Sequence, residues 1–273
     1  MAKYFFAEKA SGWQVVLKKI RTKHPLILLL DYDGTLTPIR RRPEQAMLSE
    51  RTRELLRELA WRPGLLVGIV TGRSLSDIVK MAGLKEVWYA ANHGLEIKFK
   101  NMDWIHPLAR KNAPLLARVH QVLRQSLKAA QGVLVEDKTY TVSVHYRNLR
   151  GWPVSRVKKT VADAVQPHAG KLKLSEGKKV LEIRPDIPWD KGKAALKIIA
   201  LAHLRQKPLV IYIGDDRTDE DAFRALNPSG ITVRVGKKRK TEARYYIKDT
   251  AEVNKMLKLL LDFHQAGGRD NEY

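Results

Sequence analysis

The sequence predicts an α/β protein with a Rossmann-like core, built on a parallel sheet, and an inserted α+β domain. The first and last thirds alternate apolar runs with amphipathic helices, which is typical of a parallel sheet covered by helices. The middle third differs, because it contains two strand pairs, each preceded by a helical stretch. We therefore expect a core domain of residues 1–107 and 185–273 and an inserted domain of residues 108–184.

The first part of the core alternates helices and strands. Leu26–Leu30 is wholly aliphatic, which indicates a strand buried on both faces. Ser74 is followed three residues later by Asp77, a capping pattern that marks a helix start. In chain order we expect a helix with Trp13, Val16, Leu17 and Ile20 on one face, a strand Leu26–Leu30, a helix Ser49–Ala60, a strand Leu65–Val70, a helix capped by Ser74 and a strand Val87–Ala91. The first helix is expected to pack on its own domain, and a membrane-surface or targeting helix is the alternative.

The chain returns to the core after the insertion. Leu209–Ile213 is the last strand that we expect. A helix follows, for which Thr218 and Asp221 have the spacing of a capping box. The closing stretch AEVNKMLKLLLDFH has the period of an amphipathic helix.

The strands of the insertion alternate apolar and polar residues, which predicts a sheet with one face covered by helices. Val142 and Val144, for example, alternate with Ser143 and His145. The opposite, polar face is expected to hold Glu136, Lys138, His145, Arg147, Glu182 and Arg184. The pattern alone leaves open whether this face is merely solvated or binds a polar ligand.

Composition limits the possible functions. Without cysteine the chain can form neither disulfides nor thiolate metal sites, so a cytoplasmic location is expected. No apolar stretch reaches the length of a membrane span, so we expect no membrane association. The net charge of +22 suits nucleic acid or other anionic ligands. Most of this charge is scattered, and the one dense cluster, GKKRK at residues 236–240, lacks interleaved aromatic residues, so nucleic acid is not expected as the main partner.

Acidic residues follow two core strands at the point where each ends. Asp31 and Asp33 come after Leu26–Leu30, and Asp215 and Asp216 come after the last expected strand. This edge of an open parallel sheet is where ligands bind. Carboxylates about 4 Å apart would repel by about 4 kcal/mol per pair at an effective dielectric of 20, so a bound cation is expected. Only oxygen ligands are offered, which favours Mg²⁺.

Two further segments suit a phosphate group. Thr71 to Ser74, TGRS, follows the second strand and leads into a helix, where a hydroxyl and backbone N–H groups can bind an anion. Lys191 comes just before another predicted helix, and in company with the acids and Thr71 it is best interpreted as a phosphate ligand.

Together these segments resemble a known family. DYDGTLTPI, TGRS, DKG and GDDRTDEDAF resemble, in order, the four motifs of the haloacid dehalogenase superfamily of phosphotransferases. The insertion is similar to the α/β cap, type C2B, of its sugar-phosphatase branch. NHGLEI, VEDK, HYR and EIRP in the same chain resemble the trehalose-6-phosphate phosphatases, over residues 24 to 265. The resemblance implies Mg²⁺-dependent hydrolysis of trehalose 6-phosphate through an aspartyl-phosphate, in trehalose biosynthesis.

The resemblance also implies roles for single residues. Asp31 would be the nucleophile, and Asp33 would act first as acid and then as base. Mg²⁺ would be held by Asp31, the main-chain carbonyl of Asp33 and Asp215, with Asp216 and Asp219 in support. The substrate would be bound by Thr71, Gly72, Arg73, Lys191, Asn92, His93, Glu136, Lys138, Arg147, Glu182 and Arg184, with Thr71 and Lys191 on the phosphoryl oxygens.

Two alternatives share part of this pattern. A related phosphatase could act on another sugar phosphate, such as sucrose-6-phosphate or mannosyl-3-phosphoglycerate. A basic nucleic-acid module could retain a vestigial site. The favoured hypothesis is a monomeric cytoplasmic enzyme whose partner is a small sugar phosphate.

Overall fold

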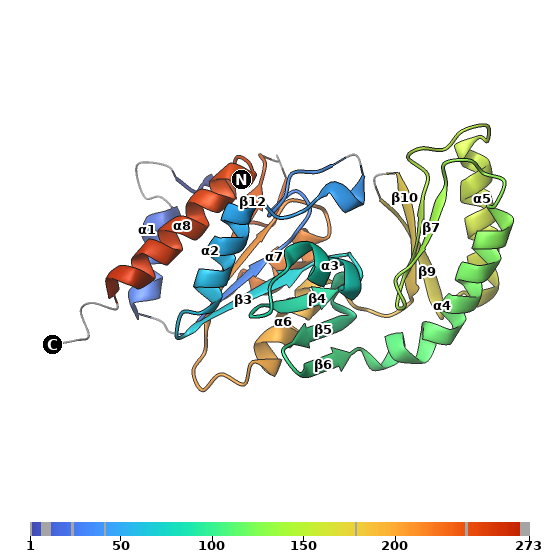
Figure 1. The fold of residues 1–273 in the computed structure, drawn as a ribbon. Coiled ribbons are helices and arrows are strands. Elements are labelled where there is room, and N and C mark those ends of the chain that lie inside the picture. The colour runs from blue at the N-terminus through green and yellow to red at the C-terminus, as the bar shows by residue number, and fades with distance from the viewer. Residues whose placement is uncertain are drawn as a thin grey trace. The chain divides into compact units, whose positions relative to one another are not determined.

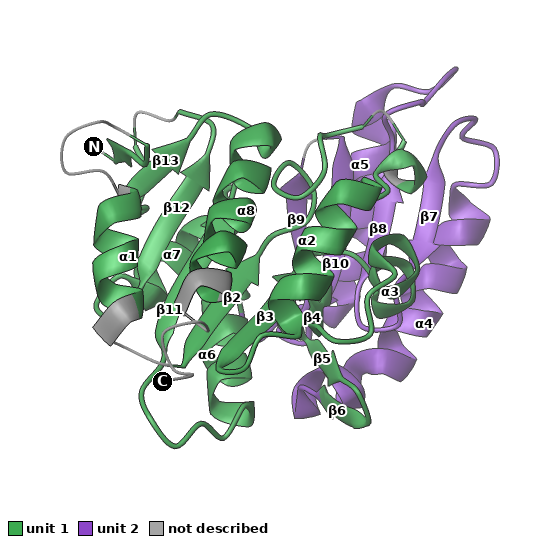
Figure 2. Ribbon diagram, turned by 60° about the vertical axis from the view of Figure 1, so that its left-hand side comes forward, with its two compact units in different colours: residues 1–104, 190–273 green, residues 105–189 purple. Residues whose placement is uncertain are grey.

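The computed structural model describes residues 2–6, 12–22, 25–40, 42–177, 179–237 and 240–267. The chain divides into two compact units (Figure 2). Unit 1 contains residues 1–104 and 190–273, and unit 2 contains residues 105–189. Lys238 and Arg239 of the basic GKKRK segment lie outside the described residues.

Unit 1 is built on a nine-stranded sheet in the order β1-β13-β12-β11-β2-β3-β4-β5-β6 (Figure 1). Neighbouring strands from β1 to β4 are parallel, and β5 runs antiparallel to β4. The predicted parallel α/β core is therefore confirmed. Its strands are β1 (Lys3–Tyr4), β2 (Leu26–Leu30), β3 (Leu65–Val70), β4 (Trp88–Ala91), β5 (Glu96–Phe99), β6 (Met102–Ile105), β11 (Leu209–Gly214), β12 (Ile231–Val235) and β13 (Tyr245–Ile247).

The prediction that Leu209–Ile213 is the last strand is wrong, because β12 and β13 follow it. β12 reads ITVRV, so a threonine and an arginine interrupt the aliphatic run that marked the other strands. β13 has only three residues, too few for a periodicity to be seen.

The helices of unit 1 are α1 (Gly12–Thr22), α2 (Glu50–Ala60), α3 (Leu75–Ala82), α6 (Lys191–Leu201), α7 (Asp219–Leu226) and α8 (Thr250–Gly267), with short 3₁₀ turns at Pro43–Gln45 and Asn92–Gly94. The predicted cap of α3 is confirmed, because the Ser74 hydroxyl accepts a hydrogen bond from the Asp77 N–H at 3.2 Å. The capping box predicted for α7 is wrong. Thr218 stands at the N-cap but its side chain makes no capping hydrogen bond, and its backbone is helical.

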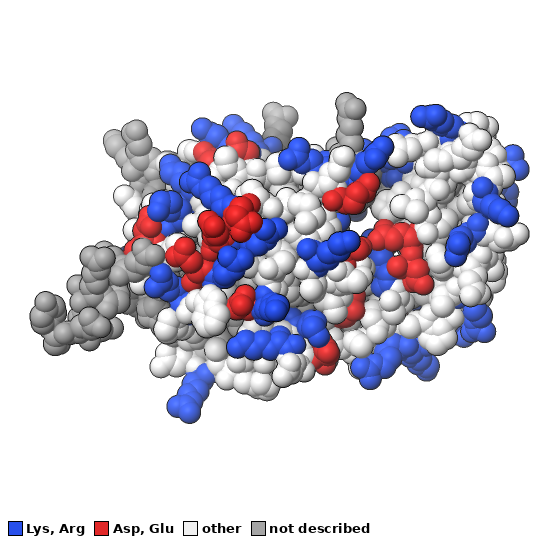
Figure 3. Space-filling view, in the orientation of Figure 1, with Lys and Arg blue, Asp and Glu red and all other residues white. Residues whose placement is uncertain are grey.

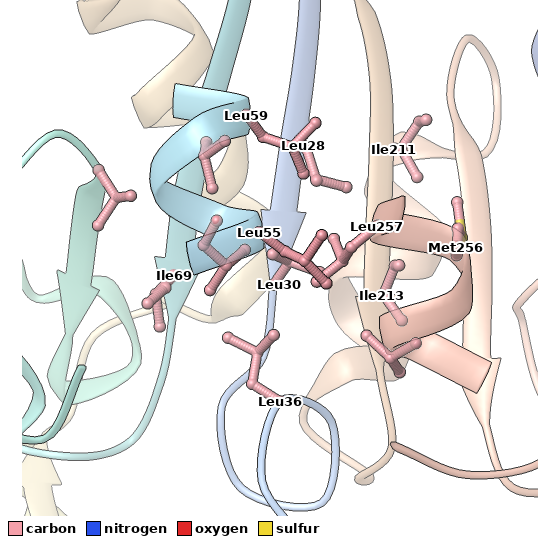
Figure 4. Close-up of a cluster of buried hydrophobic side chains, with 14 of the residues drawn as sticks. Leu28, Leu30, Leu36, Leu55, Leu59, Ile69, Ile211, Ile213, Met256 and Leu257 are labelled. Carbon is pink, nitrogen blue, oxygen red and sulfur yellow. The ribbon is translucent and has the colours of Figure 1, made fainter. Parts of the chain in front are cut away.

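Strand β2 is buried on both faces. Leu28 and Leu30 pack in one cluster with Leu55 of α2 and Leu257 of α8 (Figure 4). Neighbouring side chains along the strand point to the opposite face, where α7 lies against β11 and its Phe223 ring meets Tyr212 with centroids 5.8 Å apart. The interpretation of the aliphatic run as a doubly covered strand is thus confirmed.

Helix α1 packs on its own unit. Val16 and Ile20 are fully buried in the cluster that includes β2, and Trp13 is packed against it. Apolar side chains used in this way are not available to a membrane surface, so the membrane alternative for this helix loses its basis. Among the described residues no helix is long and apolar enough to cross a membrane.

Unit 2 has a four-stranded antiparallel sheet in the order β7-β8-β10-β9, with its two main helices on one face. The elements are α4 (Pro107–Ser126), β7 (Leu134–Asp137), β8 (Val142–His145), α5 (Val154–Val165), a 3₁₀ turn at Gln166–His168, β9 (Leu172–Gly177) and β10 (Val180–Pro185). Val142, Val144 and Ile183 pack with α4 and α5 in a separate core. The predicted alternation is confirmed, since these buried positions alternate with the polar face.

Lys and Arg are spread over the face of the molecule seen in Figure 3, with Asp and Glu among them. The positive net charge of +22 is thus not gathered in one patch of that face.

Replacing Leu30 by alanine should lower the free energy of unfolding by about 2–5 kcal/mol, because it leaves a cavity in the core of unit 1. Urea or thermal unfolding would measure this. Leu196→Ala on α6, whose side chain is 47% exposed, is the matched control and should change stability by less than about 0.5 kcal/mol. Equal effects of the two substitutions would contradict the packing described here.

Candidate active site

The first two acids of the site come from neighbouring strands. β2 and β11 are parallel, with Leu30 opposite Ile213, so Asp31 and Asp215 leave the same edge of the sheet. The Asp31 N–H donates to the Ile213 carbonyl at 2.8 Å, which continues the ladder to the end of the strand. Ordinary strand pairing therefore brings together residues that are far apart in the sequence.

Asp31, Asp215 and Asp219 form one cluster, in which one carboxylate oxygen of each lies within 4.8 Å of the others. Asp31 is 4% exposed and Asp219 is completely buried. Among the described residues this is the one group of three acidic or histidine side chains with the spacing of a metal site. The predicted meeting of acids from the two strands is therefore observed.

Lys191 is inserted between two of these acids. As the first residue of α6 it is 3% exposed, and its Nζ lies 2.6 Å from Asp31 Oδ1 and 2.8 Å from Asp219 Oδ1. The Asp190 side chain caps the helix by accepting from the Lys193 N–H at 2.9 Å, which fixes the helix start. The lysine is a buried, doubly paired ammonium and not a surface residue.

The acids differ in how many hydrogen bonds their carboxylate oxygens already accept. Asp219 accepts hydrogen bonds from Lys191 and the Tyr212 hydroxyl on Oδ1, at 2.8 Å each, and from the Asp216 N–H on Oδ2 at 2.9 Å. Asp215 Oδ1 is buried without a hydrogen-bond partner. A buried carboxylate oxygen without a partner is costly, and a cation would supply what it lacks. The donor set, carboxylate oxygen only, fits a hard divalent ion such as Mg²⁺.

Two glycines allow the acids to come this close. A Cβ on Gly34 would lie 2.2 Å from Asp215 Oδ2, and Gly34 also has a φ of +86°. A Cβ on Gly214 would lie 2.3 Å from the Asp219 carboxyl carbon. Both positions therefore require glycine, one for backbone conformation and space, the other for space alone.

Burial dominates the protonation of this cluster. It raises the pKa of Asp31 well above its usual range, although the charge of Lys191 opposes the shift. Burial, helped by the charge of Asp219, raises the pKa of Asp215 to about 6. Burial would lower the pKa of Lys191, but Asp219 and Asp31 outweigh it and hold this pKa above its usual value. The lysine therefore stays charged, while the raised pKa values make Asp31 and Asp215 easier to protonate when no cation is bound.

Asp33, the predicted acid and base, is held by Arg73. The guanidinium forms a fork on the carboxylate, Nε to Oδ2 and Nη2 to Oδ1, both at 2.6 Å. The same guanidinium lies 5.5 Å from the centroid of the Tyr32 ring. Tyr32, between the two acids, turns into the core, and its hydroxyl donates to the Ala46 carbonyl at 2.7 Å. Arg73 was predicted to bind substrate, and here it contacts an acid of the site.

The other predicted residues of unit 1 lie on two loops that bind each other. The His93 N–H donates to the Thr71 carbonyl and the Asn92 N–H to the Arg73 carbonyl, both at 2.8 Å. Gly72 allows this contact, because a Cβ there would lie 2.8 Å from the His93 ring. Thr71 is 2% exposed, and its own N–H is bonded to Ala90. Its hydroxyl accepts from the Arg73 N–H at 3.2 Å.

Asn92 is fully buried. Its amide donates to Glu96 Oε1 at 2.7 Å, and burial raises the pKa of Glu96. Asn92 and His93 have φ values of 49° and 57°, so the loop is held in a left-handed turn. Asp216 is exposed, and its N–H bonds to Asp219.

The polar face of unit 2 brings together four of its six predicted residues. Glu136 and Glu182 are both opposite Ser143 in the register, on either side of the middle strand. Lys138 Nζ lies 3.8 Å from a carboxylate oxygen of each. His145 Nε2 lies 2.7 Å from Glu136 Oε2. Of the remaining two predicted residues, Arg147 is exposed, and Arg184 is partly buried with its Nε lacking a hydrogen-bond partner.

Sequence reasoning missed Tyr212, whose hydroxyl donates to Asp219 from within strand β11. A tyrosine in an apolar strand that ends in acids was the available signal, because a buried hydroxyl needs a partner. It also missed two contacts of Asp219, which binds Lys191 through Oδ1 and accepts from the Asp216 N–H of its own loop through Oδ2.

Comparison with known proteins agrees with the family resemblance found in the sequence. The trehalose-phosphatase family matches residues 29–251. The chain belongs to this family. Trehalose-phosphate phosphatase B of Arabidopsis thaliana is 35% identical over 254 residues, 87% of this chain and 67% of the relative. The trehalose-phosphate phosphatase of Mycobacterium tuberculosis is 40% identical over 213 residues, 76% of this chain and 53% of the relative. The chain thus spans about half the length of the mycobacterial relative.

Solved structures agree on the fold of the family. The C-terminal domain of a Candida trehalose-6-phosphate phosphatase (C. albicans) matches with a TM-score of 0.76 and 25% identity, over 91% of this chain and 96% of that one. A haloacid dehalogenase-like hydrolase from Bacteroides thetaiotaomicron matches with a TM-score of 0.62 and 16% identity, over 87% of this chain and all of that one. The expected haloacid dehalogenase fold is therefore confirmed.

Cation binding should weaken in acid. Because the pKa of Asp215 is about 6, protons compete with Mg²⁺ below that pH, and the rise in Tm on adding Mg²⁺ should shrink as pH falls through about 6. Without a cation, acid should stabilise the protein instead. The folded-state pKa lies above the unfolded value, so protonation stabilises the fold, and the free energy of unfolding should rise from about pH 6 to about pH 4. Asp215→Asn is the control and should abolish the response to Mg²⁺ at every pH. A response that is independent of pH in the native protein would contradict this site.

Gly34→Ala should disturb the same site sterically, without removing a ligand. The new Cβ would overlap the Asp215 carboxylate at a residue with positive φ, so we expect a loss of about 1–3 kcal/mol in stability together with weaker Mg²⁺ binding. Gly64→Ala is the control, because it also has a positive φ but meets no atom within 4 Å. Denaturation and titration with Mg²⁺ measure both effects. If the two variants bind Mg²⁺ equally well, Asp215 does not need the space at Gly34.

Proposed function

We propose that this protein hydrolyses trehalose 6-phosphate to trehalose and phosphate, as a Mg²⁺-dependent step in trehalose biosynthesis. The observation that carries the proposal is the buried Asp31, paired with Lys191 at 2.6 Å and clustered with Asp215. Membership of the trehalose-phosphatase family supports the reaction and the substrate. A chain without cysteine agrees with a cytoplasmic location, where we propose that it acts as a monomer.

In the first step, a carboxylate oxygen of Asp31 forms a bond to phosphorus as the bond from phosphorus to the sugar oxygen breaks. Asp33 donates a proton to the departing sugar oxygen. In the second step, Asp33 takes a proton from water, whose oxygen bonds to phosphorus as the bond to Asp31 breaks. Phosphate leaves, and Asp33 is protonated for the next cycle. One difficult displacement is thereby divided into two easier ones.

Other residues orient these groups. Lys191, charged and fixed by Asp219, holds the Asp31 carboxylate in place and supplies positive charge for the phosphoryl oxygens. Arg73 orients Asp33 through its two-point contact. Asp31, Asp215 and the Asp33 carbonyl would hold Mg²⁺, which when bound supplies charge neutralisation at the phosphoryl group. Asp216 and Asp219 would support these ligands.

For the sugar we propose the polar face of unit 2. Glu136, Lys138 and Glu182 offer acceptors and a donor for neutral hydroxyl groups, and each hydrogen bond to a charged group is worth about 1.5–3 kcal/mol. Arg147, Arg184, Asn92 and His93 are proposed as further substrate contacts, and Thr71 and Gly72 as phosphoryl contacts. Another sugar phosphate as substrate is less favoured, because the relatives in the family are named for trehalose phosphate.

Phosphate release should be measured on trehalose 6-phosphate, sucrose-6-phosphate and mannosyl-3-phosphoglycerate, with Mg²⁺ and with a chelator. We expect a preference for the first substrate and no turnover without Mg²⁺. Asp31→Asn should abolish turnover, because the amide cannot attack phosphorus, while thermal unfolding shows an intact fold. Glu44→Gln, on an exposed 3₁₀ turn, is the control for loss of one charge. Equal rates on the three substrates, or turnover by Asp31→Asn, would refute the proposal.

A further inference from the structure

Arg234 is a charged residue in a strand whose five residues are all buried. It is 9% exposed, next to last in β12. A buried guanidinium without partners would be strongly destabilising, so it needs hydrogen-bond acceptors nearby. Nη2 donates to the main-chain carbonyl of Asp215, Nη1 to that of Asp216 at 3.3 Å, and Nη1 also to Glu220 Oε1 at 2.9 Å. All three of these partners lie on the segment that carries Asp215 and Asp219.

The sheet register brings the arginine to that segment. β11 and β12 are parallel, and Arg234 is opposite Gly214, the last residue before Asp215. Ile231, Val233 and Val235 pack in the core of unit 1, so the intervening Arg234 points to the other face of the sheet. One guanidinium there can reach two successive carbonyls just past the end of the neighbouring strand.

Glu220 extends the contact. Its Oε1 accepts from Arg234, and its Oε2 accepts from the Thr241 hydroxyl at 3.0 Å and the Glu242 N–H at 2.7 Å. The loop after β11, the start of α7 and the turn before β13 are thus joined through one ion pair. Both side chains of that pair are little exposed, at 11% and 13%.

We propose that Arg234 is a positioning residue for the cation site: by binding the carbonyls of Asp215 and Asp216 it fixes the orientation of the Asp215 carboxylate. A carbonyl oxygen that is held in place fixes its peptide plane, and the direction of the side chain follows from the backbone. The planar fork of arginine can hold two carbonyls at once, which the single ammonium of lysine does not reproduce. The inference rests on the proposed function, in which Asp215 binds Mg²⁺.

The test measures Mg²⁺ binding directly, by calorimetric titration of the whole protein in parallel with phosphate release. Arg234→Lys and Arg234→Met should each raise the dissociation constant for Mg²⁺ by about 10- to 100-fold, as loss of a group that orients a metal ligand does. Turnover by these variants should be low at limiting Mg²⁺ and should largely recover at saturating Mg²⁺, because Asp31 and Asp33 are unchanged. Glu220→Gln should have a smaller effect in the same direction, since the carbonyl contacts remain.

Arg224→Met is the matched control. Arg224 also pairs with acids of this region, Asp221 and Glu242, but its side chain is 60% exposed and it contacts neither carbonyl. Its replacement removes the same charge and should leave Mg²⁺ affinity unchanged. Circular dichroism and unfolding without Mg²⁺ identify any variant that fails to fold, and the milder Glu220→Gln keeps the test decisive if both Arg234 variants are lost.

The possible outcomes distinguish failure of the proposed function from failure of the inference about Arg234. If the native protein binds no Mg²⁺, the proposed function fails and Arg234 has no cation site to support. If the native protein binds Mg²⁺ and the folded Arg234 and Glu220 variants bind it equally well, the inference alone is overturned. Normal binding by Arg234→Lys with loss in Arg234→Met also overturns it, because charge and not the two-point contact would then be responsible.

Discussion

The rest of the site depends on repulsion between carboxylates that two neighbouring parallel strands deliver to one buried place. Asp31, Asp215 and Asp219 have oxygens within 4.8 Å of each other, and Lys191 offsets one of the three charges. Two negative charges are left, which is the charge that a divalent cation offsets. Burial adds to this repulsion, because it raises the pKa of Asp31 and of Asp215 and so disfavours their charged forms when no cation is bound.

A buried strand, two glycines and one arginine hold these acids close together. Leu26–Leu30, buried on both faces, holds Asp31 rigidly at its end. Gly34 and Gly214 leave space for acids that any Cβ would displace. Arg234, one strand further along the sheet, binds the carbonyls of the loop that carries Asp215. The precision of the cluster therefore comes from the sheet edge and the neighbouring strand together.

Charge compensation recurs on a smaller scale in each of the two units. Arg73 contacts Asp33 through two hydrogen bonds of 2.6 Å, and in unit 2 Lys138 lies between Glu136 and Glu182. Both the Arg73–Asp33 pair and the Lys138–Glu182 pair join segments that are about 40 residues apart in the sequence. Groups held in this way have little conformational freedom left to lose when they bind a polar ligand.

Sequence alone was sufficient for the features that depend on local pattern: the aliphatic strand Leu26–Leu30, the cap at Ser74, the alternation in the insertion and the convergence of acids after parallel strands. Tertiary structure decided the pairings across the chain. It placed Arg73 on Asp33, Asp219 between Lys191 and Tyr212, and Arg234 on the Asp215 loop. Strand β12 was missed for the same reason, since its arginine looks unsuited to a buried strand until its acceptors, 14 to 19 residues earlier in the chain, are known. Periodicity reports which face a residue occupies, but the partner of a buried charge is determined by contacts that no local pattern contains.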